Sequence, residues 1–382
     1  MLASCIALAM IVQSPTFVNQ VSLAIQSDPA RAETLIRDKF QAPDLAEGVS
    51  PQKDGLKVLF AIDPGLGKHE ASVSGDNLAE IELDRVGNLL AAVVELRPGL
   101  GSTVNYVVDG KKRLKTYNLE VYAGNRIVES PPGGRKGELR PMGEWKSAIF
   151  PGTIRKWFVY LPPNVDASRE YPVLIGTDAQ WDREWQANAL ENGARDGLIP
   201  PTVGVFIEPG QDKPGNYSFR SREYDRLSPD YPDFLLKEIL PEVQKLIKLS
   251  PDPAKRALIG VSSGGICGFT CCWEHPEAFG TVISAVGSFD DIAHGESLRE
   301  GGHNYPFMIR LTEKKPIRVF LQDGVRDLDN QFGNWYLGNA QMAAALKFKG
   351  YDVQWRPGEG FHSSDHLRSI FDEALRWWLG GK

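Results

Sequence analysis

One segment of the chain has the residue types and the spacing of a serine nucleophile. Gly260, Ser262 and Gly264 follow an apolar run at residues 256–259, and a helical stretch comes after them. A strand that enters Gly-x-Ser-x-Gly and continues into a helix is typical of a nucleophile elbow, a tight turn that lifts the serine hydroxyl clear of the sheet. The pattern therefore predicts Ser262 as a nucleophile. It also predicts the Ser263 amide, at the helix start, as a donor to an oxyanion.

Two histidines near the end of the chain are candidates for the base that such a serine needs. His362 lies in a glycine-rich loop after a strand predicted at residues 351–355, where a catalytic loop is expected. His366 lies near the start of the last helical stretch, residues 367–379. Position favours His362, with His366 as the alternative.

A carboxylate that orients the histidine should follow the strand predicted at residues 317–321. Asp323, Asp327 and Asp329 all lie just beyond that strand. Asp323 precedes a glycine and suits a turn, whereas Asp327 lies far enough past the strand to fold back toward the histidine loop. Asp327 is favoured. Asp323, Asp329 and a serine–histidine pair without an acid stay open.

Further candidates could complete an oxyanion hole or hold a substrate. A second oxyanion donor is expected in the loop after an earlier central strand. The backbone amides of Ala179 and Gln180 are candidates there, although an ordinary strand–helix loop also fits. Arg220 can grip a carboxylate or a sugar hydroxyl, and Trp181 can stack on a ring, although core packing is the default for a tryptophan. Glu223 is a further substrate-binding candidate, with an Arg220–Glu223 ion pair as the alternative interpretation.

The elements around these residues predict two domains, for which 382 residues leave room. Short apolar runs broken by glycine and proline predict a β-sandwich over residues 27–135, ending in a Pro-Pro-Gly-Gly linker. Over residues 136–382, apolar strands alternate with helical stretches, which predicts an α/β domain with a mostly parallel sheet. The predicted strands are 57–62, 91–96 and 104–108 in the sandwich, then 155–161, 173–175, 203–207, 256–259, 282–286, 317–321 and 351–355; the predicted helices are 232–249, 265–275, 338–349 and 367–379.

Composition limits the class of protein. The net charge is −6, with 43 basic against 49 acidic residues, which argues against a nucleic-acid partner. No apolar run reaches the roughly 20 residues that span a bilayer, so no membrane span is predicted. Cys267, Cys271 and Cys272 are interpreted as small buried residues of one helix, because no distant partner or further ligand is visible. No metal and no cofactor are expected, and the oligomeric state stays open.

The first 26 residues predict a signal peptide or an apolar N-terminal segment. No charged residue precedes Asp28, and residues 6–12 form an apolar core of signal-peptide size that lacks a positive n-region. Cys5 is interpreted as part of this apolar stretch. A periplasmic or secreted location is expected, or a cytoplasmic one if the segment is retained as a helix that packs on the domain.

Several motifs in order give the chain a family resemblance. It resembles the enterochelin esterase group of the α/β-hydrolases, within the esterase D superfamily that also holds feruloyl and acetyl-xylan esterases. The motifs are WKSAIFPGTIR at 145–155, RSREYD at 220–225, EILP at 238–241, GVSSGGIC at 260–267, WEHPEAFG at 273–280, VFLQDGVRDLD at 319–329 and the loop at 358–366. The resemblance implies an α/β-hydrolase fold after an immunoglobulin-like domain, with Ser262, Asp327 and His362 in the triad positions. In one departure, the chain reads Gly-Thr-Asp-Ala at 176–179, where many relatives have Asp-Gly.

Together these features predict a serine carboxylic-ester hydrolase that acts through an acyl-enzyme. The expected substrate is a carbohydrate-linked feruloyl or acetyl ester, or a similar small ester. The alternatives are a siderophore trilactone esterase, an acyltransferase on the same scaffold and a non-catalytic carbohydrate-binding protein. The net negative charge counts against an anionic iron–siderophore substrate. The intact serine, aspartate and histidine set counts against a non-catalytic protein.

Overall fold

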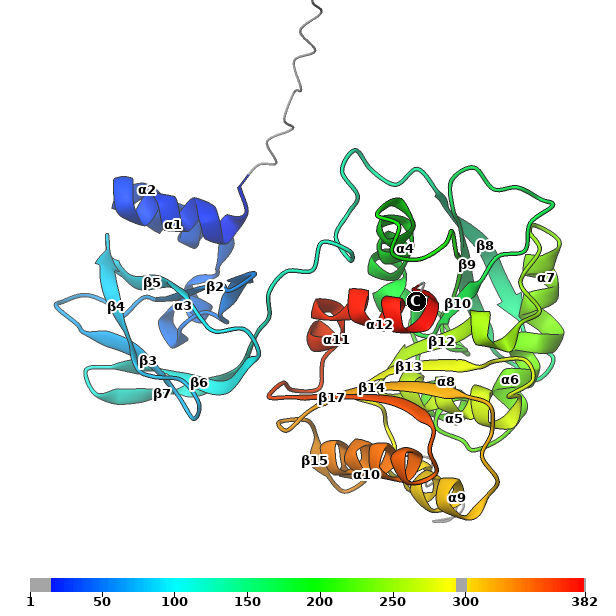
Figure 1. Cartoon of the computed structure of the whole chain (residues 1–382). Helices are drawn as coiled ribbons and strands as arrows, with labels where there is room; N and C mark the ends of the chain where they lie inside the picture. The colour runs from blue at the N-terminus through cyan, green and yellow to red at the C-terminus, as the bar shows by residue number, and fades with distance from the viewer. Residues whose placement is uncertain (1–14, 293–300, 381–382) are drawn as a thin grey trace, which may run out of the picture. The chain divides into compact units, whose positions relative to one another are not determined.

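A computed structural model describes residues 15–292 and 301–380 of the chain. It separates into two compact units, the first ending at Gly124 and the second beginning at Asn125 (Figure 1). Cys5 and the apolar core predicted at residues 6–12 lie outside the described residues. None of the helices in the described ranges combines the length and the apolarity that a membrane crossing requires.

The first unit is a curled antiparallel sheet covered by short helices. Its strands are β1 (Gln52–Asp54), β2 (Lys57–Ile62), β3 (Ala71–Gly75), β4 (Ile81–Val86), β5 (Leu89–Glu95), β6 (Leu100–Val108) and β7 (Lys111–Val121), in the spatial order β1-β2-β5-β4-β3-β6-β7. Its helices are α1 (Phe17–Ser27), α2 (Pro29–Lys39) and α3 (Ala42–Glu47). The sheet bends along β4, because the first half of that strand pairs with β3 and the second half with β5.

Strand β2 shows why these residues form a layered core. Phe60 and its neighbours two positions away face the inside of the curl, whereas Leu59 and Ala61 face the helices. Since successive side chains of a strand point to opposite faces, both faces of β2 are buried and its sequence is almost continuously apolar. The predicted strand at 57–62 is confirmed, while the immunoglobulin-like sandwich stays a prediction.

Helix α1 packs on this sheet through one apolar face. Val18, Val21 and Ala24 recur at helical spacing and are buried. The Thr16 hydroxyl caps the helix by accepting a hydrogen bond from the Asn19 amide at 3.3 Å.

The second unit contains an eight-stranded mixed sheet with helices on both faces (Figure 1). Its strands are β8 (Glu138–Lys146), β9 (Ile154–Leu161), β10 (Val173–Gly176), β11 (Val203–Ile207), β12 (Arg256–Val261), β13 (Thr281–Ala285), β14 (Arg318–Gly324) and β17 (Asp352–Gly358), in the order β17-β14-β13-β12-β10-β11-β9-β8. The six strands from β17 to β11 are parallel, and β9 and β8 close the edge antiparallel. A small ribbon of β15 (Asp329–Asn330) and β16 (Gly333–Asn334) lies outside this sheet. The predicted α/β architecture with a mostly parallel sheet is confirmed.

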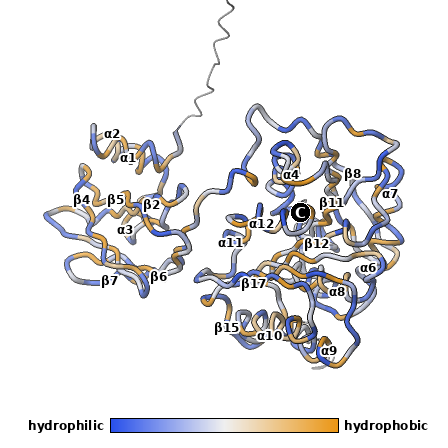
Figure 2. The backbone as a smooth tube through the Cα atoms, in the orientation of Figure 1, coloured by the Kyte–Doolittle hydropathy of each residue, from blue (hydrophilic) through white to orange (hydrophobic). Residues whose placement is uncertain are grey.

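Two apolar cores lie on the two faces of this sheet, and hydrophobic residues concentrate in its central strands (Figure 2). One face is covered by α4 (Ala179–Arg195), α11 (Asp365–Ser369) and α12 (Phe371–Leu379). The other face is covered by α5 (Arg220–Tyr224), α6 (Asp230–Phe234), α7 (Leu240–Gln244), α8 (Ser263–Glu274), α9 (Tyr305–Leu311) and α10 (Trp335–Phe348). Every residue of β10, β11 and β13 is buried, as expected for parallel strands covered on both sides. The three cysteines of α8 are buried and free.

The structure differs from the sequence prediction in two places near this core. The single helix predicted at 232–249 is broken into α6, a π-helical turn (Leu235–Ile239) and α7, and Pro241 lies in the first turn of α7. The segment that begins at Asn125 packs on the second unit rather than on the sandwich predicted to run to residue 135. The Asn192 side chain in α4 donates to the carbonyls of Ile127 and Glu129 at 2.9 Å each.

Candidate active site

Ser262 lies at the sharp turn between β12 and α8. Its backbone has φ 60° and ψ −124°, a conformation that a residue with a side chain rarely adopts. Its amide donates to the Ala285 carbonyl at 2.9 Å, and its carbonyl accepts from the Gly265 amide at 2.9 Å. A Cβ atom at Gly260 would lie 2.2 Å from the Gly264 carbonyl carbon, so the turn requires glycine there. The predicted strand–turn–helix context of the serine is present.

His362 connects Ser262 to Asp327 through its two ring nitrogens. The Nε2 atom lies 2.8 Å from Ser262 Oγ, and Nδ1 lies 2.5 Å from Asp327 Oδ1. Because an ionised carboxylate only accepts, Nδ1 carries the ring proton and Nε2 is left to accept the serine proton. The Asp327 side chain is fully buried, whereas 24% of the His362 side chain is exposed. A base that is held by a buried acid and open toward solvent suits proton transfer to and from a bound substrate.

The other three residues weighed for these positions lie elsewhere. Asp323 is buried at the end of β14, where it accepts from the Asn339 side chain at 2.7 Å. Asp329 is exposed in β15. His366 Nδ1 faces the Gln322 side chain at 3.0 Å, and burial lowers the pKa of this imidazole. The structure thus brings Asp327 and His362 together with Ser262. Asp323, Asp329 and His366 are not part of this hydrogen-bonded line.

Two further carboxyl groups crowd the buried side of Asp327. Burial raises the pKa of Asp323 to about 10, and the adjacent Asp327 side chain adds to that rise. Burial also raises the pKa of Asp290 to about 7, again with a contribution from Asp327. Carboxyls placed this close cannot all be ionised at neutral pH. The proton that Asp323 keeps at neutral pH reduces repulsion around Asp327.

Arg220 is bound to the loop that precedes α4 instead of to Glu223. Its guanidinium makes a two-pronged ion pair with Asp178, at 2.7 Å to Oδ1 and 2.8 Å to Oδ2. It also donates to the Val261 carbonyl at 3.2 Å, one residue before the nucleophile. The Asp178 backbone has φ 54°, so the ion pair holds a left-handed turn in place. The predicted Arg220–Glu223 ion pair is wrong, because the sheet brings residue 178 closer.

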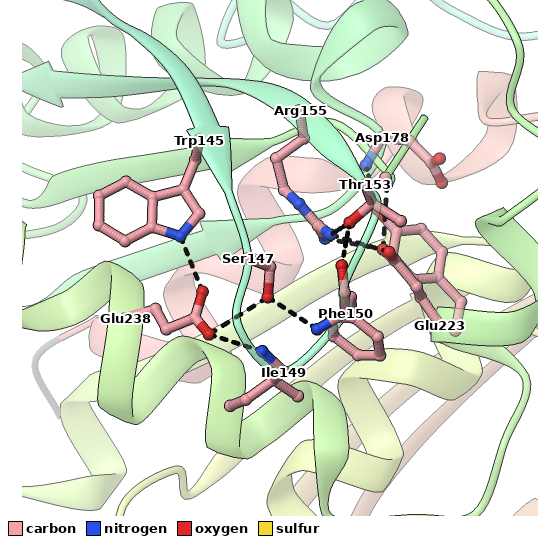
Figure 3. Close-up of polar contacts among 11 residues, drawn as sticks. Trp145, Ser147, Ile149, Phe150, Thr153, Arg155, Asp178, Glu223 and Glu238 are labelled. Carbon is pink, nitrogen blue, oxygen red and sulfur yellow. Dashed lines mark hydrogen bonds and ion pairs between the residues drawn. The ribbon is translucent and has the colours of Figure 1, made fainter. Parts of the chain in front are cut away.

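Glu223 is part of a separate buried ion pair (Figure 3). Its carboxylate binds the Arg155 guanidinium at 2.7 and 2.8 Å, and the Gly210 amide donates to it at 3.0 Å. The side chains of Arg155 and Glu223 are 0% and 1% exposed. Glu223 is therefore placed as a structural residue of the fold and offers no oxygen to a substrate.

A second acid, Glu238, is partly buried and supports the neighbouring loop (Figure 3). Glu238 accepts from Trp145 Nε1 at 2.7 Å, from the Ser147 hydroxyl at 3.2 Å and from the amides of Ala148 and Ile149 at 3.0 Å. Partial burial alone would raise the pKa of Glu238, but the hydrogen bonds from these donors outweigh it and lower the pKa. The motifs around residues 145–155 and 238–241 are thus joined in space.

The proposed oxyanion donors lie at the starts of two adjacent helices. Ser263 begins α8, and Ala179 and Gln180 begin α4, where helix amides have no partner within the helix. The two starts are in close contact, since a Cβ atom at Gly264 would lie 3.0 Å from Asp178 Oδ2. The side-chain amide of Gln180 is buried without a hydrogen-bond partner among the described residues. The roles of these amides as oxyanion donors stay a prediction.

Aromatic rings and a cavity lie next to these helix starts. Trp181 is 61% exposed, its ring centroid is 5.8 Å from that of Tyr217, and the Arg220 guanidinium lies 5.9 Å from it. Tyr217 also lines a cavity of about 380 Å³, whose polar lining includes Glu208 and Gln211. Burial raises the pKa of Glu208. Trp181 is therefore not packed in the core, and its neighbours form a polar and aromatic surface.

Sequence reasoning missed two side chains that contact Ser262 or His362. The Ser288 hydroxyl lies 3.2 Å from Ser262 Oγ, and the Trp335 ring packs edge-on against His362 with centroids 5.9 Å apart. Ser288 follows the apolar strand predicted at 282–286, so its place after a central strand was the available signal. Trp335 begins α10 and carries no such signal.

Comparison with known proteins shows which proteins this chain resembles. The family model described as "Putative esterase" matches residues 148–294. The curated iron(III) enterobactin esterase of Dickeya dadantii (strain 3937) is 28% identical over 257 residues. This alignment covers 62% of the present chain but only 54% of the relative, so the chain spans about half the length of that protein.

Solved structures show the same fold at lower identity. The enterobactin esterase from Shigella flexneri, crystallised in the presence of enterobactin, matches with a TM-score of 0.62 and 16% identity, over 88% of this chain and 96% of that one. A ferulic acid esterase from Anaeromyces mucronatus matches with a TM-score of 0.53 and 15% identity, over 68% of this chain and 96% of that one. The resemblance to the enterochelin esterase group, inferred from the motifs, is confirmed.

Proposed function

We propose that this chain is a serine carboxylic-ester hydrolase with Ser262, His362 and Asp327 as its catalytic triad. The observation that carries the proposal is the continuous line of hydrogen bonds from Ser262 Oγ through both nitrogens of His362 to the buried Asp327. A serine hydroxyl is a poor nucleophile alone, and a neutral imidazole at 2.8 Å can take its proton. Two independent sequence motifs supply these residues: the elbow contains Ser262, and the glycine-rich loop contains His362.

The reaction follows from the positions of these groups. Ser262 Oγ attacks the ester carbonyl carbon while His362 Nε2 takes the hydroxyl proton, and Asp327 stabilises the imidazolium that forms. The carbonyl oxygen gains negative charge, which the amides of Ser263 and of Ala179 or Gln180 stabilise. His362 then gives its proton to the leaving alcohol. Water, activated by the same imidazole, releases the acid from the acyl-enzyme.

The surface around Trp181 and the cavity that Tyr217 lines are proposed to hold the polar alcohol part of an ester. Trp181 and Tyr217 offer ring faces. The cavity lined by Tyr217 also presents Glu208 and Gln211, which are hydrogen-bonded to each other at 3.2 Å, and its lining includes Lys156 and Lys213. Rings next to amide and carboxyl groups suit a sugar, which has apolar C–H faces and vicinal hydroxyls. The Arg220 charge is neutralised by Asp178, so this cation is not left to attract an anionic siderophore. A carbohydrate-linked feruloyl or acetyl ester is therefore the proposed substrate class.

A hydrolysis panel with a Ser262→Ala variant tests the proposal. The panel compares ethyl ferulate, an acetylated xylan fragment, a short p-nitrophenyl ester and a catecholate trilactone. We expect Ser262→Ala to lower kcat by about 10⁴-fold or more on every ester that the unmodified chain hydrolyses, and a fluorophosphonate probe to label Ser262. Full activity of Ser262→Ala would refute the mechanism. Preference for the trilactone over the ferulate and acetyl esters would refute the substrate class alone.

A further inference from the structure

Ser288 is a fully buried serine that contacts the nucleophile from the neighbouring strand. It follows β13 by three residues and is 0% exposed. Its amide donates to the Ser262 carbonyl at 3.1 Å, and its hydroxyl lies 3.2 Å from Ser262 Oγ. Backbone and side chain thus both hold Ser288 against the same residue. The triad as described above makes no use of this hydroxyl.

The surrounding hydrogen bonds fix the direction in which the Ser288 proton points. Trp335 Nε1 lies 3.1 Å from Ser288 Oγ, and an indole nitrogen can only donate, so Ser288 Oγ accepts there. The Ser262 proton is directed to His362 Nε2 at 2.8 Å. Between the two serine oxygens, the proton therefore comes from Ser288. One line of donors runs from Trp335 through Ser288 to Ser262.

We propose that Ser288 is a further catalytic residue, whose hydroxyl donates a hydrogen bond to Ser262 Oγ and stabilises negative charge on that oxygen during turnover. The proposal rests on the proposed function, because it assigns a role toward the nucleophile of that reaction. Trp335 is the positioning residue: by donating to Ser288 Oγ it leaves the Ser288 proton free to point at Ser262.

The effect should be greatest when the acyl-enzyme breaks down. In that step a water oxygen bonds to the acyl carbon and gives its proton to His362. The bond between the acyl carbon and Ser262 Oγ then breaks, its electron pair stays on Oγ, and His362 returns a proton to that atom. Charge therefore builds on Oγ while the Ser288 hydrogen bond is in place, which strengthens that bond in the transition state. In acylation charge also develops on Oγ, but the gain is smaller, because the free Ser262 hydroxyl already accepts the Ser288 hydrogen bond well, whereas the ester oxygen of the acyl-enzyme accepts it weakly.

Steady-state and burst kinetics with p-nitrophenyl acetate separate the two steps. Since kcat/KM reports acylation only and kcat includes deacylation, Ser288→Ala should lower kcat more than kcat/KM. A hydrogen bond to a charged oxygen is worth about ten-fold to a hundred-fold in rate, and we expect a loss of that size in deacylation. The acyl-enzyme should accumulate, visible as a burst that approaches one p-nitrophenol per active site.

Ser284→Ala is the matched control. Ser284 is also a fully buried serine and lies in β13, the strand that precedes Ser288; its hydroxyl has no hydrogen-bond partner among the described residues. We expect this variant to keep both rate constants within about two-fold. Trp335→Phe keeps an aromatic ring against His362 but removes the Nε1 donor, so its deacylation rate should fall between those of the unmodified chain and Ser288→Ala.

Three outcomes would overturn the role of Ser288. One is a deacylation rate of Ser288→Ala within two-fold of the unmodified rate at unchanged melting temperature. Another is an equal loss in kcat and kcat/KM that Ser284→Ala shares. If Ser288→Ala does not fold, an unchanged deacylation rate in Trp335→Phe would overturn it. Failure of the proposed function is distinguishable, because the unmodified chain would then show no Ser262-dependent hydrolysis and no fluorophosphonate labelling.

Discussion

Replacing Asp290 by asparagine should stabilise the second unit above neutral pH and have little effect in acid. The Asp290 side chain is 6% exposed, and its Oδ2 atom has no hydrogen-bond partner among the described residues. Burial, with a contribution from Asp327, raises its pKa from 3.8 to about 7. A carboxyl whose pKa is raised on folding holds its proton more tightly in the folded state. The free energy of unfolding therefore falls as the pH rises from about 3.8 to about 7 and stays lower above that range.

The size of the effect follows from the same two values. A rise from 3.8 to about 7 is about 3 pH units, and each unit corresponds to about 1.4 kcal/mol, so ionised Asp290 costs as much as about 4 kcal/mol above pH 7. Asparagine keeps the shape of the side chain and does not ionise. Asp290→Asn should thus raise the free energy of unfolding by up to about 4 kcal/mol at pH 8, and by well under 1 kcal/mol at pH 4.

Urea unfolding followed by tryptophan fluorescence measures this change in the free energy of unfolding for the second structural unit. The first of the nine tryptophans in the chain is Trp145, so the signal reports on the second unit alone. The control is Asp329→Asn, which removes an exposed carboxylate from a nearby loop and should not change stability differently at the two pH values. If Asp290→Asn raises the free energy of unfolding equally at pH 4 and pH 8, the cost assigned to ionised Asp290 is wrong.

Three further predictions concern the triad and its supports. Asp327→Asn should lower kcat by about 10⁴-fold with KM nearly unchanged, because the histidine loses its orienting acceptor; steady-state kinetics on the preferred ester measure this, and a loss below ten-fold would contradict the assignment. Glu223→Gln should destabilise the fold by about 3–5 kcal/mol, since it leaves the Arg155 charge buried and uncompensated; urea unfolding at pH 7.5 gives the value, and a change under 1 kcal/mol would count against the buried pair. Gly260→Ala should cost more than about 4 kcal/mol, because its Cβ atom would lie 2.2 Å from the Gly264 backbone; an alanine variant with normal stability and activity would show that the elbow can relax.

The sequence predicted the parts of the site that depend on local pattern. The elbow at Ser262 and the loop of His362 have signals in neighbouring residues, and burial on both faces makes the parallel strands read as continuous apolar runs. The partner of Arg220 could not be read this way. Local spacing suggested Glu223, but the ion pair forms with Asp178, which is 42 residues away in sequence and comes close only through the packing of the fold.

The broken helix near residue 240 shows a second limit. Apolar periodicity over residues 232–249 is similar for an α-helix and for one interrupted by a π-turn, so the pattern predicts a helix without its interruption. The break also brings Glu238 to Trp145 and to the loop after it, a contact made across more than 90 residues of sequence. Long-range side-chain partners of this kind are set by how the elements pack, and no window of neighbouring residues contains them.

Backbone strain at the ends of three neighbouring strands explains why the reactive groups meet where they do. Asp178, Ser262 and Val286 have φ values of 54°, 60° and 43° and come directly after or within two residues of β10, β12 and β13. Such conformations cost about 1–3 kcal/mol each, and most for a β-branched residue such as Val286. The paired strands hold them: the Ser262 amide donates to the Ala285 carbonyl at 2.9 Å, and the Val286 amide donates to the Gln322 carbonyl at 2.7 Å. Because these strands are buried on both faces, the turns cannot relax without breaking the sheet. The turn after β12 leads into α8, and the turn after β13 leads to Ser288, whose hydroxyl contacts Ser262 Oγ at 3.2 Å, which suits the proposed acyl transfer.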